Sequence, residues 1–274
     1  MVKYWLITGD THGLVADRIQ NIAYYPPEET ALIILGDAGF NFYLNKTDIK
    51  LKRTINALGY RIYCLRGNHE ERPERIAGIH PYEDEDVKGV VWKETEYDNI
   101  RYFMDGGIYN IGGLRVLCIG GAYSVDKWYR LKRCGIYDKL HPDYTNSKKT
   151  GWFPAEQLTD KEMNEIESNI EDKTFDLVLT HTCPISWEPT DLFIPGLDQT
   201  TVDKSMENWL NTLKDKFEWK IWLFGHYHDD RLVRPGVEMY YHDIENIQDI
   251  WERWQKPDHL DWWLKKDPNY YMEE

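Results

Sequence analysis

The sequence predicts an α/β fold in which mixed β-sheets lie between layers of helices. Two observations lead to this prediction: short apolar runs that lead into Gly- or Thr-containing turns with Asp or His, and helix-like polar segments between the runs. The apolar runs occupy residues 3–8, 30–35, 60–65, 175–180 and 219–224. Continuous runs of this length, rich in Ile, Leu and Val, are typical of strands buried on both faces. Their alternation with helices predicts right-handed βαβ units and a largely parallel sheet.

Three segments between the runs are predicted to be helices: residues 46–58, 155–170 and 203–214. In the first, four apolar residues fall near one face: Ile49, Leu51, Ile55 and Leu58. Gly59 follows as a plausible C-cap, since glycine tolerates the left-handed backbone that ends many helices. Thr159 is a candidate N-cap within the second segment.

Other stretches predict antiparallel structure. Residues 99–119 contain short apolar runs separated by Gly pairs and are predicted to form a meander. Residues 231–242 are predicted to form a hairpin that turns at Pro235 and Gly236. Residues 80–98 are acidic and poor in aliphatic side chains, which favours a surface excursion. A mixture of parallel and antiparallel pairs is compatible with two stacked sheets.

We expect one catalytic domain over residues 1–243 and an aromatic tail over residues 244–274. Trp251 and Trp254 are three residues apart, a helical spacing, and we expect this tail to pack on the domain. Packing on a partner, with oligomerisation through the tail, is the alternative. The tail carries two further tryptophans, Trp262 and Trp263.

Composition narrows the class of protein. Twelve Trp and 19 Tyr among 274 residues favour a packed globule over disorder. A net charge of −14 disfavours binding to extended nucleic acid or to anionic membranes, because both need clustered Lys and Arg. No segment approaches the ~20 apolar residues of a membrane span. The four cysteines are scattered without a CxxC pair, which favours buried thiols in a reducing, cytoplasmic setting. Cys183 lacks the phosphate loop of a thiol phosphatase and is better explained as a packed thiol.

The turns after the apolar runs carry side chains that bind metals. In chain order they are Asp10, His12, Asp37, Asn68, His69, His181, His226 and His228. Ligands bind beyond the carboxyl ends of strands in an open parallel sheet, so we expect these side chains to converge. Carboxylates, an amide oxygen and imidazoles form a mixed set suited to Mn, Fe or Zn. Each turn alone is a weak signal, but five in order make a purely structural explanation improbable.

The series DxH, GD, GNHE, a later His and GHxH resembles the calcineurin-like metallophosphoesterase superfamily, and the motifs span residues 9–228. This resemblance implies a four-layer α-β-β-α sandwich with two mixed β-sheets flanked by helices. It also implies two divalent transition metal ions, with Mn favoured over Fe or Zn. By motif, one ion would be held by Asp10, His12, Asp37 and His228. The second would be held by Asp37, Asn68, His181 and His226, with Asp37 bridging.

The implied activity is hydrolysis of a phosphoester. A hydroxide that bridges the metals would attack phosphorus, the catalytic residues Asn68 and Arg66 would assist, and His69 would donate a proton to the leaving group. GDTHG and LRGNHE resemble the phosphoprotein-phosphatase branch, but the Asp-Arg-Gly of that branch is missing. Phe40 and Asn41 stand in its place, so the group that orients His69 is open, with Glu70 one candidate.

Three residues are candidate substrate contacts: Arg66, Tyr123 and Arg130. Arg66 would bind phosphate through its planar fork, or alternatively form an ion pair with Glu70 or Glu71. We expect a phosphatase acting on phosphomonoesters of a small molecule, a nucleotide or a phosphoprotein. A phosphodiesterase or a hydrolase of nucleotides or dinucleoside polyphosphates is the alternative. A nuclease and a non-catalytic binding module are weaker hypotheses.

Overall fold

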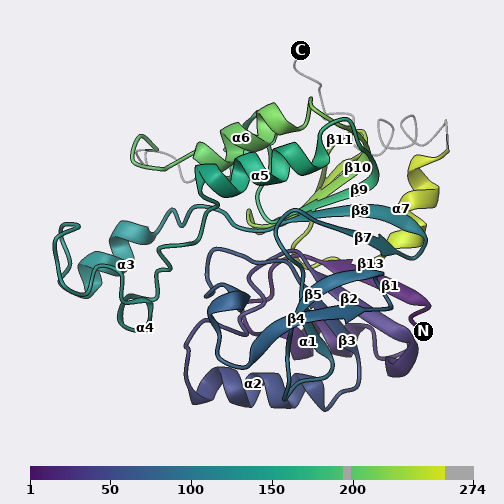
Figure 1. The fold of residues 1–274 in the computed structure, drawn as a ribbon, viewed down its shortest axis with the longest axis horizontal. Helices are drawn as coiled ribbons and strands as arrows, with labels where there is room; N and C mark the ends of the chain where they lie inside the picture. Colours follow the sequence, from purple (N-terminus) through teal and green to yellow (C-terminus); the bar gives the residue numbers. More distant parts are fainter. Residues whose placement is uncertain (194–198, 257–274) are drawn as a thin grey trace.

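The computed structural model describes residues 1–193 and 199–256, which form two stacked β-sheets between layers of helices (Figure 1). The first sheet has seven strands in the spatial order β13-β1-β2-β3-β6-β5-β4. The second sheet has six strands in the order β11-β12-β10-β9-β8-β7. Both sheets contain parallel and antiparallel pairs. The predicted α/β fold with two mixed sheets flanked by helices is confirmed.

The first sheet is built around three of the predicted apolar runs. Its strands are β1 (Tyr4–Thr8), β2 (Thr30–Ile34), β3 (Arg61–Cys64), β4 (Ile79–Asp84), β5 (Gly89–Glu94), β6 (Ile100–Tyr102) and β13 (Glu245–Asn246). Strands β1, β2, β3 and β6 are parallel neighbours. The prediction of a surface excursion over residues 80–98 is wrong, because this segment forms the β4–β5 hairpin at the sheet edge. An edge strand tolerates charged side chains, and β4 is largely exposed. The acidic composition of the segment therefore did not indicate a strand.

The second sheet contains the other two apolar runs. Its strands are β7 (Gly107–Ile111), β8 (Leu114–Ile119), β9 (Thr174–Thr180), β10 (Glu218–Phe224), β11 (Arg231–Arg234) and β12 (Val237–Met239). The hairpin predicted at Pro235 and Gly236 is confirmed by β11 and β12. The meander over residues 99–119 is corrected: β7 and β8 pair antiparallel, but β6 belongs to the first sheet. The chain crosses between the sheets within this segment.

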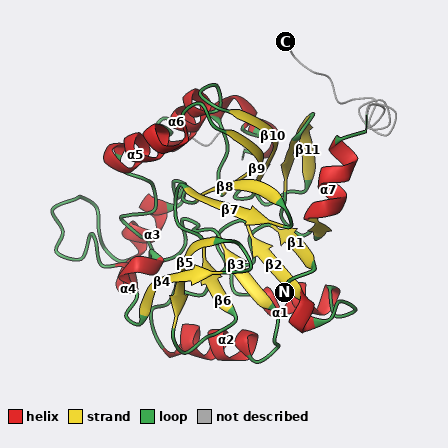
Figure 2. Cartoon of the chain, turned by 45° about the vertical axis from the view of Figure 1, so that its right-hand side comes forward, coloured by secondary structure: helices red, strands yellow, loops and turns green. Residues whose placement is uncertain are grey.

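Helices cover the outer faces of both sheets (Figures 1 and 2). The helices are α1 (Val15–Asn21), α2 (Lys46–Asn56), α3 (Lys127–Arg133), α4 (Ser147–Thr150), α5 (Asp160–Ile170), α6 (Ser205–Leu213) and α7 (Ile247–Trp254). Short 3₁₀ helices lie at Pro27–Glu29, Pro73–Arg75, Ile185–Trp187 and Thr190–Leu192. Helices α1 and α2 lie against the first sheet, and α5 and α6 against the second. Helices α3 and α4 lie on an excursion between β8 and α5, at the left of Figure 1.

The predicted helices occur with shorter bounds. Thr159 caps α5 through a capping box with Glu162, so residues 155–159 are not helical. The apolar face of α2 is narrower than predicted, because Ile49 and Leu58 are exposed while Ile55 is buried. Gly59 adopts a positive φ of 81° shortly after the helix, as expected of a residue that ends it.

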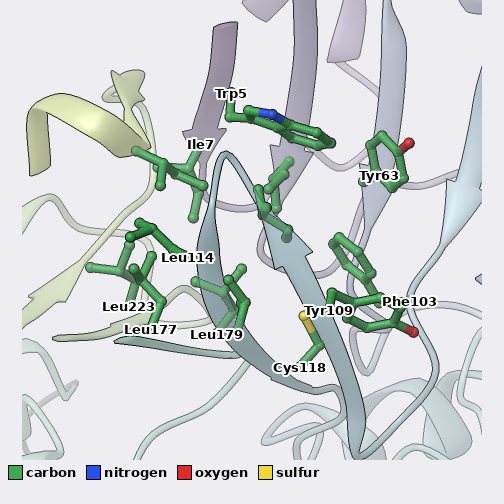
Figure 3. Close-up of a cluster of buried hydrophobic side chains, with 14 of the residues drawn as sticks. Trp5, Ile7, Tyr63, Phe103, Tyr109, Leu114, Cys118, Leu177, Leu179 and Leu223 are labelled. Carbon is green, nitrogen blue, oxygen red and sulfur yellow. The ribbon is translucent and has the colours of Figure 1, made fainter. Parts of the chain in front are cut away.

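The core between the two sheets is a single cluster of aliphatic and aromatic side chains (Figure 3). Trp251 and Trp254 of α7 pack against this cluster, and β13 pairs antiparallel with β1. The described part of the aromatic tail therefore lies on its own domain. Trp262 and Trp263 lie outside the described residues, and the boundary at residue 243 stays a prediction. All four cysteines are free, and three of them are buried, as predicted. No described helix is both long and apolar enough to cross a bilayer.

Candidate metal centre and the cavity beside it

The candidate ligands follow the carboxyl ends of central strands in both sheets. Asp10 follows β1, Asp37 follows β2, Asn68 follows β3, His181 follows β9 and His226 follows β10. Parallel pairing of β1 with β2, of β2 with β3 and of β9 with β10 places these ends at one edge of each sheet. Because the sheets stack, the two edges meet, and residues up to 216 positions apart come into contact.

The backbone at this edge adopts conformations that side chains rarely allow. Among the described residues other than glycine, seven have a positive φ, and four of these are candidate ligands: His12, Asp37, His226 and His228. Gly67 approaches Asp37 so closely that a Cβ atom on it would lie 1.8 Å from Asp37 Oδ1. Backbone strain of this kind persists where the surrounding structure enforces it, and it is concentrated at functional sites.

A first cluster of donor atoms contains Asp10, His12 and His228, all within 4.8 Å of one another. His228 Nε2 lies 3.3 Å from Asp10 Oδ2, and His12 Nε2 lies 3.9 Å from the same oxygen. The Nε2 atoms of the two histidines are 2.9 Å apart. Three of the four residues predicted for the first metal therefore converge.

A second cluster contains Asp10, Asp37 and His181. His181 Nε2 lies 3.8 Å from Asp37 Oδ2, and His12 Nδ1 of the first cluster lies 4.0 Å from that oxygen. Asp10 is the residue common to both clusters, whereas Asp37 belongs to the second, so its role as the bridging carboxylate stays a prediction. His226 is absent from both clusters, although its ring centre lies 5.0 Å from that of His181.

The hydrogen bonds around His181 leave two acceptors facing each other. His181 Nδ1 lies 2.7 Å from the carbonyl oxygen of Leu35, which can only accept, so the ring proton is on Nδ1. The Nε2 lone pair then faces Asn68 Oδ1 at 2.9 Å, and the Asn68 amide nitrogen donates to Ser124. Two acceptors at this distance repel each other unless a cation lies beside both or the ring carries a second proton, which Nε2 would donate to Asn68 Oδ1.

Two carboxylate oxygens of the candidate ligands also lack a partner that would balance their charge. Asp10 Oδ2 and Asp37 Oδ2 are both buried, and neither has a hydrogen-bond partner among the described residues. Buried ionised oxygens are costly unless they are paired or bind a metal. The oxygen and nitrogen donors, without thiolates, fit divalent transition metals such as Mn, Fe or Zn. The residues present therefore fit a metal centre.

Burial and the charges of neighbouring candidate ligands shift the pKa values of Asp10, His228 and His226. Burial alone would raise the pKa of Asp10, but the nearby imidazoles of His181 and His228 hold it below its ordinary value. The neighbouring Asp10 carboxylate in turn raises the pKa of His228. Burial lowers the pKa of His226 well below its ordinary value, which favours the neutral imidazole that binds metals.

His69, the predicted proton donor, lies beside the clusters. Its backbone N–H donates to Asp37 Oδ1 at 2.8 Å, and its ring centre lies 5.7 Å from that of His12. Burial lowers the pKa of His69, and Arg130 lowers it further. His69 Nδ1 is buried and has no hydrogen-bond partner in the described part of the chain. Glu70 does not orient it, because Glu70 Oε1 instead accepts the N–H of Gly67 at 3.0 Å.

Arg66 is not at the centre, which corrects its assignment as a catalytic and phosphate-binding residue. Its guanidinium is buried and forms an ion pair with Asp105 at 3.0 Å. The same group donates to three carbonyl oxygens, those of Gly120, Ala155 and Glu156. The ion pair that the sequence offered as an alternative, with Glu70 or Glu71, is not formed either. Every guanidinium nitrogen is engaged away from the cavity, so Arg66 is a structural residue.

Tyr123 and Arg130 both line a cavity of about 1150 Å³ that five of the candidate ligands also line. The Tyr123 hydroxyl donates to the carbonyl oxygen of Thr201 at 3.3 Å, which joins two loops across the cavity. Arg130 is paired with Asp126, its Nε lying 2.6 Å from Asp126 Oδ2. Both residues lie where substrate can reach them, and their role as substrate contacts stays a prediction.

Several lining residues were not identified from the sequence. Four of them are Phe42, Lys204, Glu207 and Tyr227. Tyr227 lies inside the GHYH motif, so proximity to predicted ligands could have identified it. Phe42 follows GDAGFN in the same way. Lys204 and Glu207 lie at the start of α6, and only the tertiary structure brings this helix end to the centre.

A comparison with family models supports the same conclusion. The model of calcineurin-like phosphoesterases matches residues 5–230, a range that contains every candidate ligand. The match is to the family as a whole and does not single out the phosphoprotein-phosphatase branch. A search among curated proteins gives no match. Members of the family hydrolyse phosphoesters with a centre of two divalent metal ions. The chain therefore belongs to the calcineurin-like phosphoesterase family and is a metal-dependent phosphoester hydrolase.

Proposed function

We propose that the protein hydrolyses phosphodiesters in preference to phosphomonoesters. The observation that carries this proposal is the charge of the cavity lining. Among the described lining residues, the Arg and Lys side chains are Arg130 and Lys204, and each is paired with a carboxylate. Asp126 neutralises Arg130, and Glu188 lies 2.6 Å from the Lys204 ammonium. No unpaired guanidinium or ammonium group of the described lining is available to a phosphate.

The remaining ionisable groups of the lining add no positive charge that balances a phosphate. Asp48 and Glu207 line the cavity without an ion pair to a described Lys or Arg, and burial raises the pKa of both, so each adds negative charge where it is ionised. At neutral pH a phosphomonoester carries about two negative charges and a diester carries one. The lining therefore repels a monoester more strongly than a diester, and the metal centre alone must attract the substrate.

The sequence favoured a phosphomonoesterase because LRGNHE resembles a phosphatase motif. That inference needed Arg66 to hold the second charge of the phosphate. Arg66 is buried against Asp105 and does not line the cavity, so its charge stabilises the fold and does not face a bound phosphate. Without it, the phosphodiesterase alternative has the stronger support.

The residues of the centre have distinct roles in this proposal. When bound, two divalent metal ions, Mn²⁺ being our proposal, supply positive charge for the phosphoryl oxygens and activate water. Asn68 is held by Ser124, and His181 by the Leu35 carbonyl oxygen, so both are oriented before substrate arrives. His69 faces the cavity and donates a proton to the departing alkoxide.

Two substrates with the same leaving group test the proposal. Methyl p-nitrophenyl phosphate is a diester and p-nitrophenyl phosphate a monoester, and both release p-nitrophenol. With Mn²⁺ present, we expect kcat/KM to favour the diester at least about ten-fold, equivalent to about 1.4 kcal/mol. Equal values, or a higher value for the monoester, would contradict the proposal.

A charge variant tests the stated cause. Glu188→Gln releases the Lys204 ammonium and adds one positive charge to the lining. We expect the preference for the diester to fall roughly three-fold, as an extra unit charge near the phosphate implies. Asp191→Asn is the matched control, because Asp191 pairs with Arg231 and neither residue lines the cavity. If Glu188→Gln leaves the preference for the diester unchanged, as the control is expected to do, the charge of the lining is not the cause of that preference.

A further inference from the structure

Exposed apolar side chains gather at the cavity that contains the metal centre. Twelve large hydrophobic side chains are exposed among the described residues, and five of them line this cavity. They are Leu14, Tyr43, Val125, Tyr129 and Leu192. Single exposed apolar residues are ordinary, but a group of them at one site marks a binding surface. Five candidate ligands line the same cavity, so a substrate bound at the centre lies next to this surface.

The lining beside His69 contains the ring of Phe42. We define the aromatic wall as Phe42 and its neighbours Tyr43 and Arg130, together with Tyr129, which precedes Arg130 in α3 and lines the same cavity. The Phe42 ring centre lies 6.5 Å from that of His69 and 4.8 Å from that of Tyr43, and the Phe42 and Tyr43 rings are nearly perpendicular. The Arg130 guanidinium carbon lies 5.8 Å from the Phe42 ring centre. Two distant segments, the loop after β2 and helix α3, therefore build one wall.

The wall is held in place before any substrate binds. Arg130 donates to Asp126 at 2.6 Å and to the carbonyl oxygen of Gly151 at 3.0 Å, which fixes the plane of its guanidinium. Phe42 also packs against Phe153, with ring centres 6.0 Å apart. Flat, fixed surfaces of this kind bind with a small loss of conformational freedom.

The position of His69 decides which part of the substrate meets the wall. In the proposed function, on which this inference rests, His69 protonates the leaving oxygen, so that oxygen must lie within hydrogen-bond reach of the ring. Phe42 is the aromatic neighbour of His69 in the wall, with ring centres 6.5 Å apart. With the leaving oxygen at His69, the alcohol attached to that oxygen is the part of the substrate closest to the wall.

We propose that the aromatic wall binds the leaving alcohol, and that this alcohol carries a flat aromatic ring. Aromatic side chains gain from offset or edge contacts with another ring, and a planar guanidinium stacks on ring faces. An aliphatic chain of the same size gains only from burial. A benzylic alcohol and a nucleoside both present such a ring.

An unsymmetrical diester tests the proposal through its products. Benzyl methyl phosphate has two cleavable bonds, and benzyl alcohol and methanol are similar leaving groups. Water adds to phosphorus, one P–O bond breaks, and the proton from His69 goes to the departing oxygen. We expect benzyl alcohol and methyl phosphate to exceed methanol and benzyl phosphate by roughly five-fold, the size of an aromatic contact. Cyclohexylmethyl methyl phosphate, equal in size without a ring face, should show a smaller bias.

Variants assign the bias to the wall. Tyr129→Leu and Phe42→Leu keep apolar volume but remove a ring face, and each should lower the benzyl bias toward the cyclohexylmethyl value. Tyr137→Leu is the matched control, because Tyr137 is an exposed tyrosine of the same excursion and lies outside the cavity. Release of mainly methanol, an equal bias for the cyclohexylmethyl ester, or an unchanged bias in both wall variants would overturn the proposal.

Two further arms separate the possible outcomes. Thymidine 5′-methyl phosphate compares a nucleoside with benzyl alcohol as the leaving group, and a higher rate for either identifies the source of the ring.

If no diester is hydrolysed, the proposed function fails on its own. The wall is then tested by comparing benzyl phosphate with cyclohexylmethyl phosphate in the same proteins. An equal kcat/KM for these two monoesters would overturn the proposed role of the wall.

Discussion

Replacing Arg66 with Gln separates a structural role from a role in phosphate binding. Arg66 is 2% exposed, and its guanidinium is held by Asp105 and by three backbone carbonyl oxygens. A Cβ atom on Gly121 would lie 2.6 Å from Arg66 Nη2, so the chain closes around the guanidinium. A structural residue in this position should affect the free energy of unfolding more than it affects chemistry.

The size of the effect follows from these contacts. Removing one partner of a buried ion pair costs about 3–5 kcal/mol, because the other partner is left unpaired. The Asp105 side chain is 19% exposed and keeps a hydrogen bond from the Gly120 N–H at 2.7 Å. We therefore expect Arg66→Gln to lower the free energy of unfolding by about 3 kcal/mol, at the lower end of this range. Asp105→Asn should cost a similar amount.

Urea unfolding followed by tryptophan fluorescence measures these changes, and the 12 tryptophans give a strong signal. In the double variant, Arg66→Gln with Asp105→Asn, the losses should add to less than the sum, with a coupling of about 2 kcal/mol. Activity at low temperature, where each variant stays folded, should change little. If Arg66→Gln keeps wild-type stability but lowers kcat/KM roughly 100-fold, as loss of a charge-stabilising donor does, the structural assignment is wrong.

Glu156→Gln should change the dependence of stability on pH. Burial raises the pKa of Glu156 to about 7, so the folded state holds this proton more tightly than the unfolded state, and wild type loses stability between about pH 4.5 and 7. Gln cannot ionise, so at pH 8 the variant should gain up to about 3 kcal/mol over wild type by urea unfolding; an equal pH profile would contradict this. Gly67→Ala should abolish Mn²⁺ binding measured by calorimetry, because its Cβ would lie 1.8 Å from Asp37 Oδ1. Gly78→Ala is the control for backbone strain without a steric clash, because Gly78 has a φ of 90° and nothing lies within 4 Å of its Cβ, and a Gly67→Ala protein that binds Mn²⁺ like wild type would refute the close approach.

The metal centre could be predicted from the sequence because its residues are tied to strand ends. An apolar run followed by Asp10 or Asp37 indicates that a buried strand ends at that point. Parallel strands bring their carboxyl ends together at one edge of the sheet. The candidate ligands needed no knowledge of side-chain contacts, and six of them meet within a few ångströms. Residue type and position after a strand carry that information.

The roles of Arg66 and of residues 80–98 depended on the tertiary structure. Arg66 lies two residues from a candidate ligand, but its partner Asp105 is 39 positions away, so no local pattern shows which way the guanidinium turns. Residues 80–98 pair at an edge where charge is tolerated, and their acidity concealed the hairpin.

By itself, then, the sequence indicated the central strands, the family and a set of candidate ligands, since all three reside in short motifs beside buried strands. The tertiary structure decided what surrounds the centre. Phe42 and Arg130 meet only because the excursion that carries α3 returns to the loop after β2, and Lys204 arrives from a third segment. Contacts between segments so distant in sequence leave no periodic signal, and these contacts shape the cavity beside the centre.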